Sequence, residues 1–115
     1  NRRVTLVSVD VPELSDLFPA LDVVTNPDLF YIRFHGRNRR GWRSGNMQKQ
    51  FDYDYSANEL LPWSTRTIPK MANQARTGIA FFNNHVRAQA PRNAKTLVEQ
   101  LAAQGMPVEN TMHML

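Results

Sequence analysis

The sequence predicts an α/β fold with about three parallel strands and two main helices. Two observations carry this prediction. Short segments rich in β-branched and aromatic residues recur along the chain, and the two later ones are each followed by a segment with helical character. A chain of 115 residues, 42% of them hydrophobic, can bury one core, so a single domain is expected.

The first and third strands are read from short apolar runs. Residues 4–9 are rich in β-branched side chains and run up to Asp10, which indicates a buried strand. Residues 79–83 are also apolar and predict a third strand, short and buried. Residues 11–28 contain three prolines and lack a helical period, so they are expected to form a loop.

The clearest strand is predicted over residues 29–35, because two kinds of side chain alternate along it. Successive side chains of a strand point to opposite faces of the sheet. The alternation therefore predicts two faces of different character. One face carries Phe30, Ile32 and Phe34, and the other carries Tyr31, Arg33 and His35.

The first helix is predicted to begin at about residue 57. Ser56 and Glu59, three residues apart, form a capping box that satisfies free amides at a helix start. Pro62 and Pro69 each remove an amide donor inside the helix, so a kink or a break is expected there. Residues 37–55, rich in Arg, Gly, Asn and Asp, are expected to form the loop before this helix.

The second helix is better specified by its pattern. Pro91 suits a first helical position, Gly105 suits the exit and Pro107 prevents continuation. We expect residues 106–115 to be a tail. The apolar stripe of the helix follows the spacing of one face and consists of Ala94, Leu97, Val98, Leu101 and Ala102.

The charges are biased toward arginine. The chain has 14 Lys and Arg against 10 Asp and Glu, and 11 of the 14 are Arg, a planar donor that suits phosphate and carboxylate.

The absence of cysteine excludes disulfides, a thiol nucleophile and cysteine-ligated metals. No signal-peptide pattern opens the chain and no apolar run approaches the ~20 residues of a membrane span, so a cytoplasmic protein without a membrane partner is expected.

Three groups of residues resemble the C-terminal part of the YecE-like family, also described as domain of unknown function seventy-two. They are Tyr31-Ile-Arg-Phe-His-Gly-Arg-Asn38, Tyr53-Asp-Tyr55-Ser, and Phe81-Phe-Asn-Asn-His85 followed by Gln89-Ala-Pro-Arg-Asn-Ala94. The resemblance covers about residues 10–104. The two prolines in the first helix depart from the family pattern.

What the resemblance implies is a TIM-type (β/α) barrel of roughly twice this length. Residues 1–105 would be the C-terminal part of that one domain, contributing its last three strands and last two helices. The barrel would be completed by the rest of the domain, an N-terminal half, or by a second copy of the chain.

In the barrel that the resemblance implies, one face of each strand contacts the helices and the other lies in the interior. Phe30, Ile32 and Phe34 would meet the helices, which puts Tyr31, Arg33 and His35 in the interior. A buried arginine needs a partner, and Asp10 at the end of the first strand is the candidate. Two interpretations of Arg33 and Asp10 stay open, an internal ion pair and a catalytic role.

Active sites of such barrels lie at the carboxyl ends of the strands, and phosphate sites form in their last loops. In this chain those loops offer glycine, amide and arginine groups near a helix start, which together suit an anion. Arg37 and Arg92 are expected to share one phosphate. The asparagines also fit ordinary turns. The candidate ligand-binding residues are Gly36, Arg37, Asn38, Asn83, Asn84, Arg87, Gln89, Arg92 and Asn93.

Candidates for catalysis are His35 and His85 at strand ends, together with Arg33 and Asp10. A histidine in such a place is also often a hydrogen-bonded structural residue. Asp52 and Asp54 alternate with tyrosines, so both acids are expected on one side of an extended segment, where they hold a cation or cap the loop. The sequence names no cofactor and no metal.

Two functions remain open from the sequence. The first is binding of a phosphorylated small molecule or a nucleic-acid phosphate at the carboxyl-terminal rim of the barrel, with hydrolase activity as an open question. In that function Trp42 and Tyr53 supply stacking surfaces beside the basic loop. The second is a non-enzymatic α/β module whose Arg-rich loop binds RNA or a protein partner.

Overall fold

A computed structural model describes residues 5–12, 23–84 and 88–109 of the chain. It contains a parallel sheet of three strands in the order β1-β2-β3, with bounds Val7–Asp10, Leu29–Phe34 and Thr77–Phe82. The register places Val9 beside Arg33 and Arg33 beside Phe81. The predicted α/β fold with parallel strands is confirmed.

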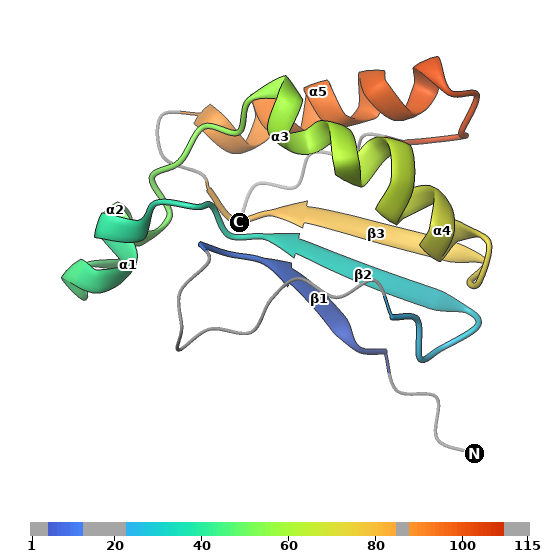
Figure 1. Ribbon diagram of the computed structural model, residues 1–115, viewed down its shortest axis with the longest axis horizontal. Helices are drawn as coiled ribbons and strands as arrows, with labels where there is room; N and C mark the ends of the chain where they lie inside the picture. Colours follow the sequence, from blue (N-terminus) through green and yellow to red (C-terminus); the bar gives the residue numbers. More distant parts are fainter. Residues whose placement is uncertain (1–4, 13–22, 85–87, 110–115) are drawn as a thin grey trace.

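One face of the sheet is covered by helices, as Figure 1 shows. Beneath them Phe30, Ile32 and Phe34 of β2 are buried, which confirms the side of β2 predicted to meet the helices. The rings of Phe34 and Phe82 stack with their centroids 4.4 Å apart. The covering elements are α3 (Ala57–Pro62), the π-helix η1 (Trp63–Thr67), α4 (Ile68–Ala72) and α5 (Gln89–Ala103).

The two prolines interrupt the first long helix where the sequence predicts it. α3 ends at Pro62, a π-helical turn follows, and Pro69 lies in the first turn of α4. The amide of Ile68 donates to the carbonyl of Trp63, five residues back, so the chain continues through a wider turn. Pro69 lacks the amide that would continue the regular helical hydrogen bonds, and a π-helical turn beside a proline is a common way for a helix to change its winding. The winding of the helix therefore changes between α3 and α4, and both parts still cover the same face of the sheet.

The segment predicted as a loop over residues 37–55 is partly helical, and that prediction is wrong. It contains α1 (Arg39–Ser44) and α2 (Met47–Gln50), which lie at the carboxyl ends of the strands (Figure 1). Asn38 caps α1 by accepting from the amide of Gly41, and a Cβ at Gly41 would overlap the carbonyl of Lys49. Glycine there serves close packing of α1 on α2.

β3 was expected to be buried, and most of it is exposed. Its residues from Thr77 to Ala80 are exposed, and only Phe82 at its end is buried. The reason is that β3 forms an edge of the described sheet, where a strand has a neighbour on one side only. β1 is likewise only partly buried, with Val7 41% exposed.

No helix among the described residues lies on the face of the sheet away from α3, α4 and α5, as Figure 1 shows. In the same described part of the chain, no helix has the length and apolar character that crossing a membrane requires.

Replacing Leu101 tests the packing of α5 on the sheet. Leu101 is 6% exposed and belongs to the core, so Leu101→Ala should lower the free energy of unfolding by about 2–5 kcal/mol. The measurement is urea denaturation followed by circular dichroism. Glu99→Ala, on the exposed side of the same helix, is the matched control and should change it by less than about 0.5 kcal/mol. Equal losses in the two variants would contradict the packing described.

Candidate functional site

A buried carboxylate organises the carboxyl ends of the strands. Asp10, at the end of β1, is 4% exposed. Arg37 donates to both of its oxygens, from Nε to Oδ2 and from Nη2 to Oδ1, each at 2.8 Å. The hydroxyl of Tyr55 donates to Oδ2 at 2.6 Å, and the amide of His35 donates to the backbone carbonyl of Asp10 at 3.0 Å. The carboxylate thus joins two strand ends to the segment before α3.

The expected pairing of Asp10 with Arg33 is wrong. In the register Asp10 lies beside Phe34, whose side chain points toward the helices, whereas Arg33 lies one position earlier and points to the other face. Asp10 therefore pairs with Arg37. Arg33 instead donates from Nε to Oδ1 of Asn83 at 3.1 Å.

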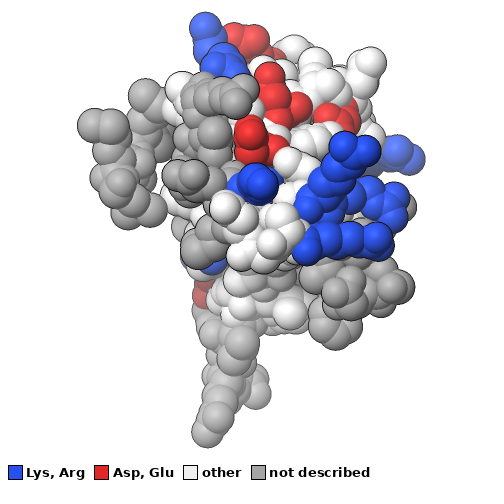
Figure 2. Space-filling view, turned by 90° about the vertical axis from the view of Figure 1, so that its left-hand side faces the viewer, with Lys and Arg blue, Asp and Glu red and all other residues white. Residues whose placement is uncertain are grey.

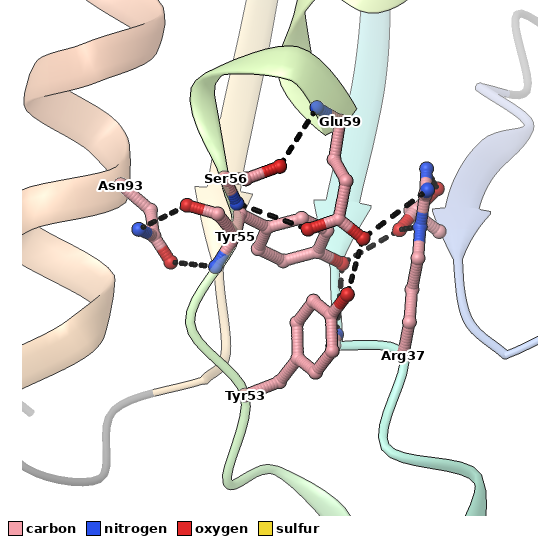
Figure 3. Close-up of polar contacts among 8 residues, drawn as sticks. Arg37, Tyr53, Tyr55, Ser56, Glu59 and Asn93 are labelled. Atoms are coloured by element: carbon pink, nitrogen blue, oxygen red, sulfur yellow. Dashed lines mark hydrogen bonds and ion pairs between the residues drawn. The ribbon is translucent and has the colours of Figure 1, made fainter.

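A second carboxylate extends this cluster to the helix layer (Figure 3). Glu59 accepts a hydrogen bond from the hydroxyl of Tyr53 and another from the amide of Ser56, and it lies 3.6 Å from Nη1 of Arg37. The predicted capping box is present, because Ser56 accepts in turn from the amide of Glu59. The cap of α3 and the Asp10 cluster therefore share one acid.

The protonation states fit these hydrogen bonds. Burial, and then the neighbouring Asp10 carboxylate, raises the pKa of Tyr55. Burial and the hydrogen bond to Glu59 raise the pKa of Tyr53, and hydrogen bonding to Asp10 raises that of Arg37. Both tyrosines are therefore neutral donors and Arg37 stays charged at neutral pH.

Three amide side chains that the sequence predicts to bind a ligand hold the segment 52–55 in the structure. Asn93 accepts from the amide of Tyr55, and Gln89 accepts from the amide of Tyr53, each at 3.0 Å. Asn84, fully buried, donates to the carbonyl of Tyr53 at 2.7 Å and to Oδ1 of Asn93 at 2.6 Å. Their polar groups anchor the backbone of this segment.

The two acids of the same segment lie on one side of it, as the sequence predicts. Asp52 accepts from Gln89 and Asp54 accepts from Asn93, both from the first turns of α5. These contacts fit the cap interpretation of the pair. Of the described residues, no group of three or more His, Asp or Glu side chains could hold a metal ion.

Gly36 and Asn38 also have partners within the protein. The amide of Gly36 donates to the hydroxyl of Tyr55 at 2.9 Å. Gly36 has a φ of 101°, and a Cβ there would lie 2.8 Å from the Cβ of Tyr53, so glycine makes room for this side chain. The side-chain amide of Asn38 donates to the carbonyls of Lys49 and Asp52, which closes the α1–α2 segment.

The two arginines expected to share a phosphate each face a carboxylate. Arg37 is held by Asp10, and Nη2 of Arg92 lies 3.8 Å from Oδ2 of Asp54 at an exposed position. The guanidinium that the phosphate hypothesis needs at residue 37 therefore already has a bidentate anionic partner. His85 and Arg87 lie outside the described residues.

His35 lies in an aromatic cluster beneath α1 and α2. Its ring stacks on Phe51 with the centroids 5.5 Å apart and meets the edge of Trp42 at 6.2 Å. Burial, followed by the charge of Arg33, lowers the pKa of His35, so the ring is neutral at neutral pH. Its Nδ1 and the Nε1 of Trp42 are buried without a hydrogen-bond partner. The half-buried ring of Trp42 therefore packs against His35 and Phe51 and is not a fully exposed stacking surface.

Basic side chains gather on the end of the molecule formed by α1 and α2 (Figure 2). Arg39, Arg40, Arg43 and Lys49 are all exposed. Within the described part of the chain, no acidic group forms an ion pair with any of these four. We call these residues the α1–α2 basic surface.

Comparison with known proteins identifies the family. The sequence matches the family described as "Protein of unknown function DUF72" over residues 1–114. The chain belongs to the DUF72 family. This confirms the family resemblance drawn from the three motifs. The chain is also similar to the UPF0759 protein YunF of Bacillus subtilis, at 28% identity over 98 residues, which are 80% of this chain and 34% of YunF.

Crystal structures of DUF72 family proteins share the fold of this chain. One from Enterococcus faecalis is 30% identical with a TM-score of 0.78, over 96% of this chain and 41% of that chain. One from Thermotoga maritima is 35% identical with a TM-score of 0.70, over 85% of this chain and 35% of that chain. This chain thus spans about two fifths or less of the relatives that it matches.

Tyr55 and Glu59 are partners of the strand-end charges that were not predicted from the sequence. The alternation of Asp and Tyr over residues 52–55, directly before the capping box, was the available signal. An alternating segment presents one row of side chains to α5 and the other to the strand ends. The acids face α5, so the tyrosines reach Asp10 and Glu59.

Removing one hydroxyl tests the cluster. In Tyr55→Phe the amide of Gly36 loses its acceptor and Asp10 loses a donor, both in buried surroundings. The free energy of unfolding should fall by about 1–3 kcal/mol, measured by urea denaturation. Tyr31→Phe removes the same atom from a half-buried position where no hydrogen bond of the hydroxyl is present in the described residues, so it should be nearly neutral. A neutral Tyr55→Phe would show that the hydroxyl does not support the site.

Proposed function

We propose that this chain is the C-terminal part of a β/α barrel that binds the phosphate backbone of a nucleic acid through the α1–α2 basic surface. The observation that carries the proposal is the set of exposed cations, Arg39, Arg40, Arg43 and Lys49, for which the described residues supply no acidic partner. Lysine and arginine that release counterions from phosphates supply most of the affinity in such binding.

The barrel part of the proposal is supported by the partial sheet. Three parallel strands carry helices on one face, which is the arrangement of strands and helices in a β/α barrel. The DUF72 relatives of solved structure are more than twice as long as this chain. The basic surface lies at the carboxyl ends of the strands, where barrels of this kind bind their ligands.

The charge pattern favours a long anion over a single small one. No Asp or Glu occurs between Asp28 and Asp52, whereas the interval contains five arginines and one lysine. Arg37 is neutralised by Asp10, and Arg33 points to the opposite face from it. The remaining cations lie on two short helices, and Arg39 and Arg43, one helical turn apart, can contact separate phosphates.

The alternative of one phosphate shared by Arg37 and Arg92 has less support, because each guanidinium faces its own carboxylate. A nucleic-acid hydrolase would need additional groups besides the neutral His35, so the proposal is confined to binding. An acidic protein partner for the same surface is the competing function, and it is tested in the experiment below.

The proposal is tested by removing the charges of α1. Binding of a fluorescent oligonucleotide is measured by anisotropy from about 50 to about 200 mM salt. In Arg39→Gln/Arg40→Gln/Arg43→Gln the plot of the logarithm of the association constant against the logarithm of the salt concentration should become less steep. The magnitude of its slope should decrease by about 1 for each arginine that contacts a phosphate, and the affinity should clearly decrease. The matched control, Arg66→Gln/Arg76→Gln/Lys95→Gln, removes the same charge from exposed positions elsewhere.

Two results would contradict the proposal. Equal losses in the two triple variants would mean that binding follows net charge alone. Binding of polyglutamate as tightly as the oligonucleotide, with the same dependence on Arg39, Arg40 and Arg43, would favour an acidic protein partner.

A further inference from the structure

The face of the sheet away from the helices carries a second arginine site. Two rows of side chains cross this face, because residues beside one another in the register point the same way. The first row is Val7, Tyr31 and Ile79, and the second is Val9, Arg33 and Phe81. Beyond the second row, His35 continues β2 and Asn83 continues β3.

Arg33 is held in place by its neighbours on β3. Its Nε donates to Oδ1 of Asn83 at 3.1 Å, and its guanidinium carbon lies 5.9 Å from the centroid of the Phe81 ring. These two contacts fix the plane of the guanidinium group. Its two terminal nitrogens, Nη1 and Nη2, have no acceptor among the described residues. The half-buried Arg33 therefore offers an oriented fork of donors at this face.

The groups around this fork are donors or apolar. The side-chain carbonyl oxygen of Asn83 accepts from Arg33, so the amide nitrogen Nδ2 of Asn83 remains as a donor. Val9 and Phe81 lie on either side of Arg33 in the register. The described strand residues that share this face include no carboxylate, and Asp10 points to the other side. A site of donors over an apolar floor suits an anion and rejects a cation.

We propose that Arg33 and Asn83 bind a small organic oxyanion, a phosphate or a carboxylate, on the face of the sheet away from the helices. The two terminal nitrogens of Arg33 match a pair of anionic oxygens, and Nδ2 of Asn83 supplies a further donor. The body of the ligand lies on Phe81 and Tyr31. This site is separate from the α1–α2 basic surface and does not depend on the binding of nucleic acid there.

His35 reports on the occupancy of this site. It follows Arg33 by two residues on the same strand, and the charged groups that act on its ring are Arg33 and Asp10. Arg33 lowers the pKa of His35 and Asp10 raises it. An anion bound to Arg33 offsets the guanidinium charge, so it must raise the pKa of His35. A change at a remote anion site would leave this pKa unchanged.

The experiment titrates the full chain with inorganic phosphate, phenyl phosphate and benzoate by calorimetry, and follows the His35 ring by NMR. His35→Asn identifies the His35 signal. Arg33→Gln should weaken phosphate binding by about tenfold or more, as expected for loss of a charge-assisted fork. Arg33→Lys should recover only part, because an ammonium group lacks the fork. Arg66→Gln, at an exposed arginine on η1, is the matched control and should bind as the parent does.

The NMR readout separates this site from general anion binding. Phosphate should raise the pKa of His35 in the parent chain, and Arg33→Gln should raise it without phosphate and abolish the further response. Stronger binding of phenyl phosphate than of inorganic phosphate would support the apolar floor, and stronger binding of benzoate than of either would assign the site to carboxylates. Thermal unfolding of each variant checks that the fold is intact.

Two outcomes would overturn the inference. In one, phosphate binds Arg33→Gln as tightly as the parent. In the other, phosphate binding is lost in the triple variant of Arg39, Arg40 and Arg43 and kept in Arg33→Gln, which would place the anion on the α1–α2 basic surface. Loss of oligonucleotide binding alone would count against the proposed function. If the pKa of His35 still responds to phosphate in an Arg33-dependent way, this inference stands.

Discussion

The buried carboxylate of Asp10 is the constraint on which this end of the molecule depends. A buried charge without a partner costs several kcal/mol, so the fold has to supply donors to it. Arg37 supplies two and Tyr55 supplies one. Each of these donors comes from a different segment, and the positions of both segments are therefore tied to the end of β1.

Two further parts of the fold follow from these ties. Arg37 stands directly before the cap of α1, so its bond to Asp10 sets where the α1–α2 basic surface begins. Tyr55 stands directly before the capping box of α3, so its bond sets where the helix layer begins. On the other side, the side chains of Gln89 and Asn93 hold the same segment against α5. One carboxylate thus positions both the proposed binding surface and the helices that bury the core.

Much of the fold could be predicted from the sequence, because local patterns determine it. The alternation over residues 29–35 gave the two faces of β2, and the capping box at Ser56 gave the start of α3. The helices α1 and α2 were missed because they are short and their stability comes from packing on each other, for which Gly41 is needed. The exposure of β3 depends on its place at an edge, which no local pattern records.

The site was harder to predict than the fold. The sequence singled out Arg37, Asn84 and Asn93 as ligand-binding residues and Asp10 as a partner of Arg33 or a catalytic residue, but it did not predict the partners that they have within the protein. The pairing of Asp10 with Arg37 and not Arg33 depends on the register of two strands. A shift of one residue exchanges the two faces, and a single sequence does not fix that register.

Asp10 and Arg37 stabilise the protein as a pair and hold α1 in place. A double-mutant cycle of Asp10→Asn and Arg37→Gln, measured by urea denaturation, tests it directly. We expect a coupling energy of about 0.5–3 kcal/mol, together with faster hydrogen exchange of the α1 amides in both single variants. Additive effects of the two substitutions, with unchanged exchange in α1, would contradict it.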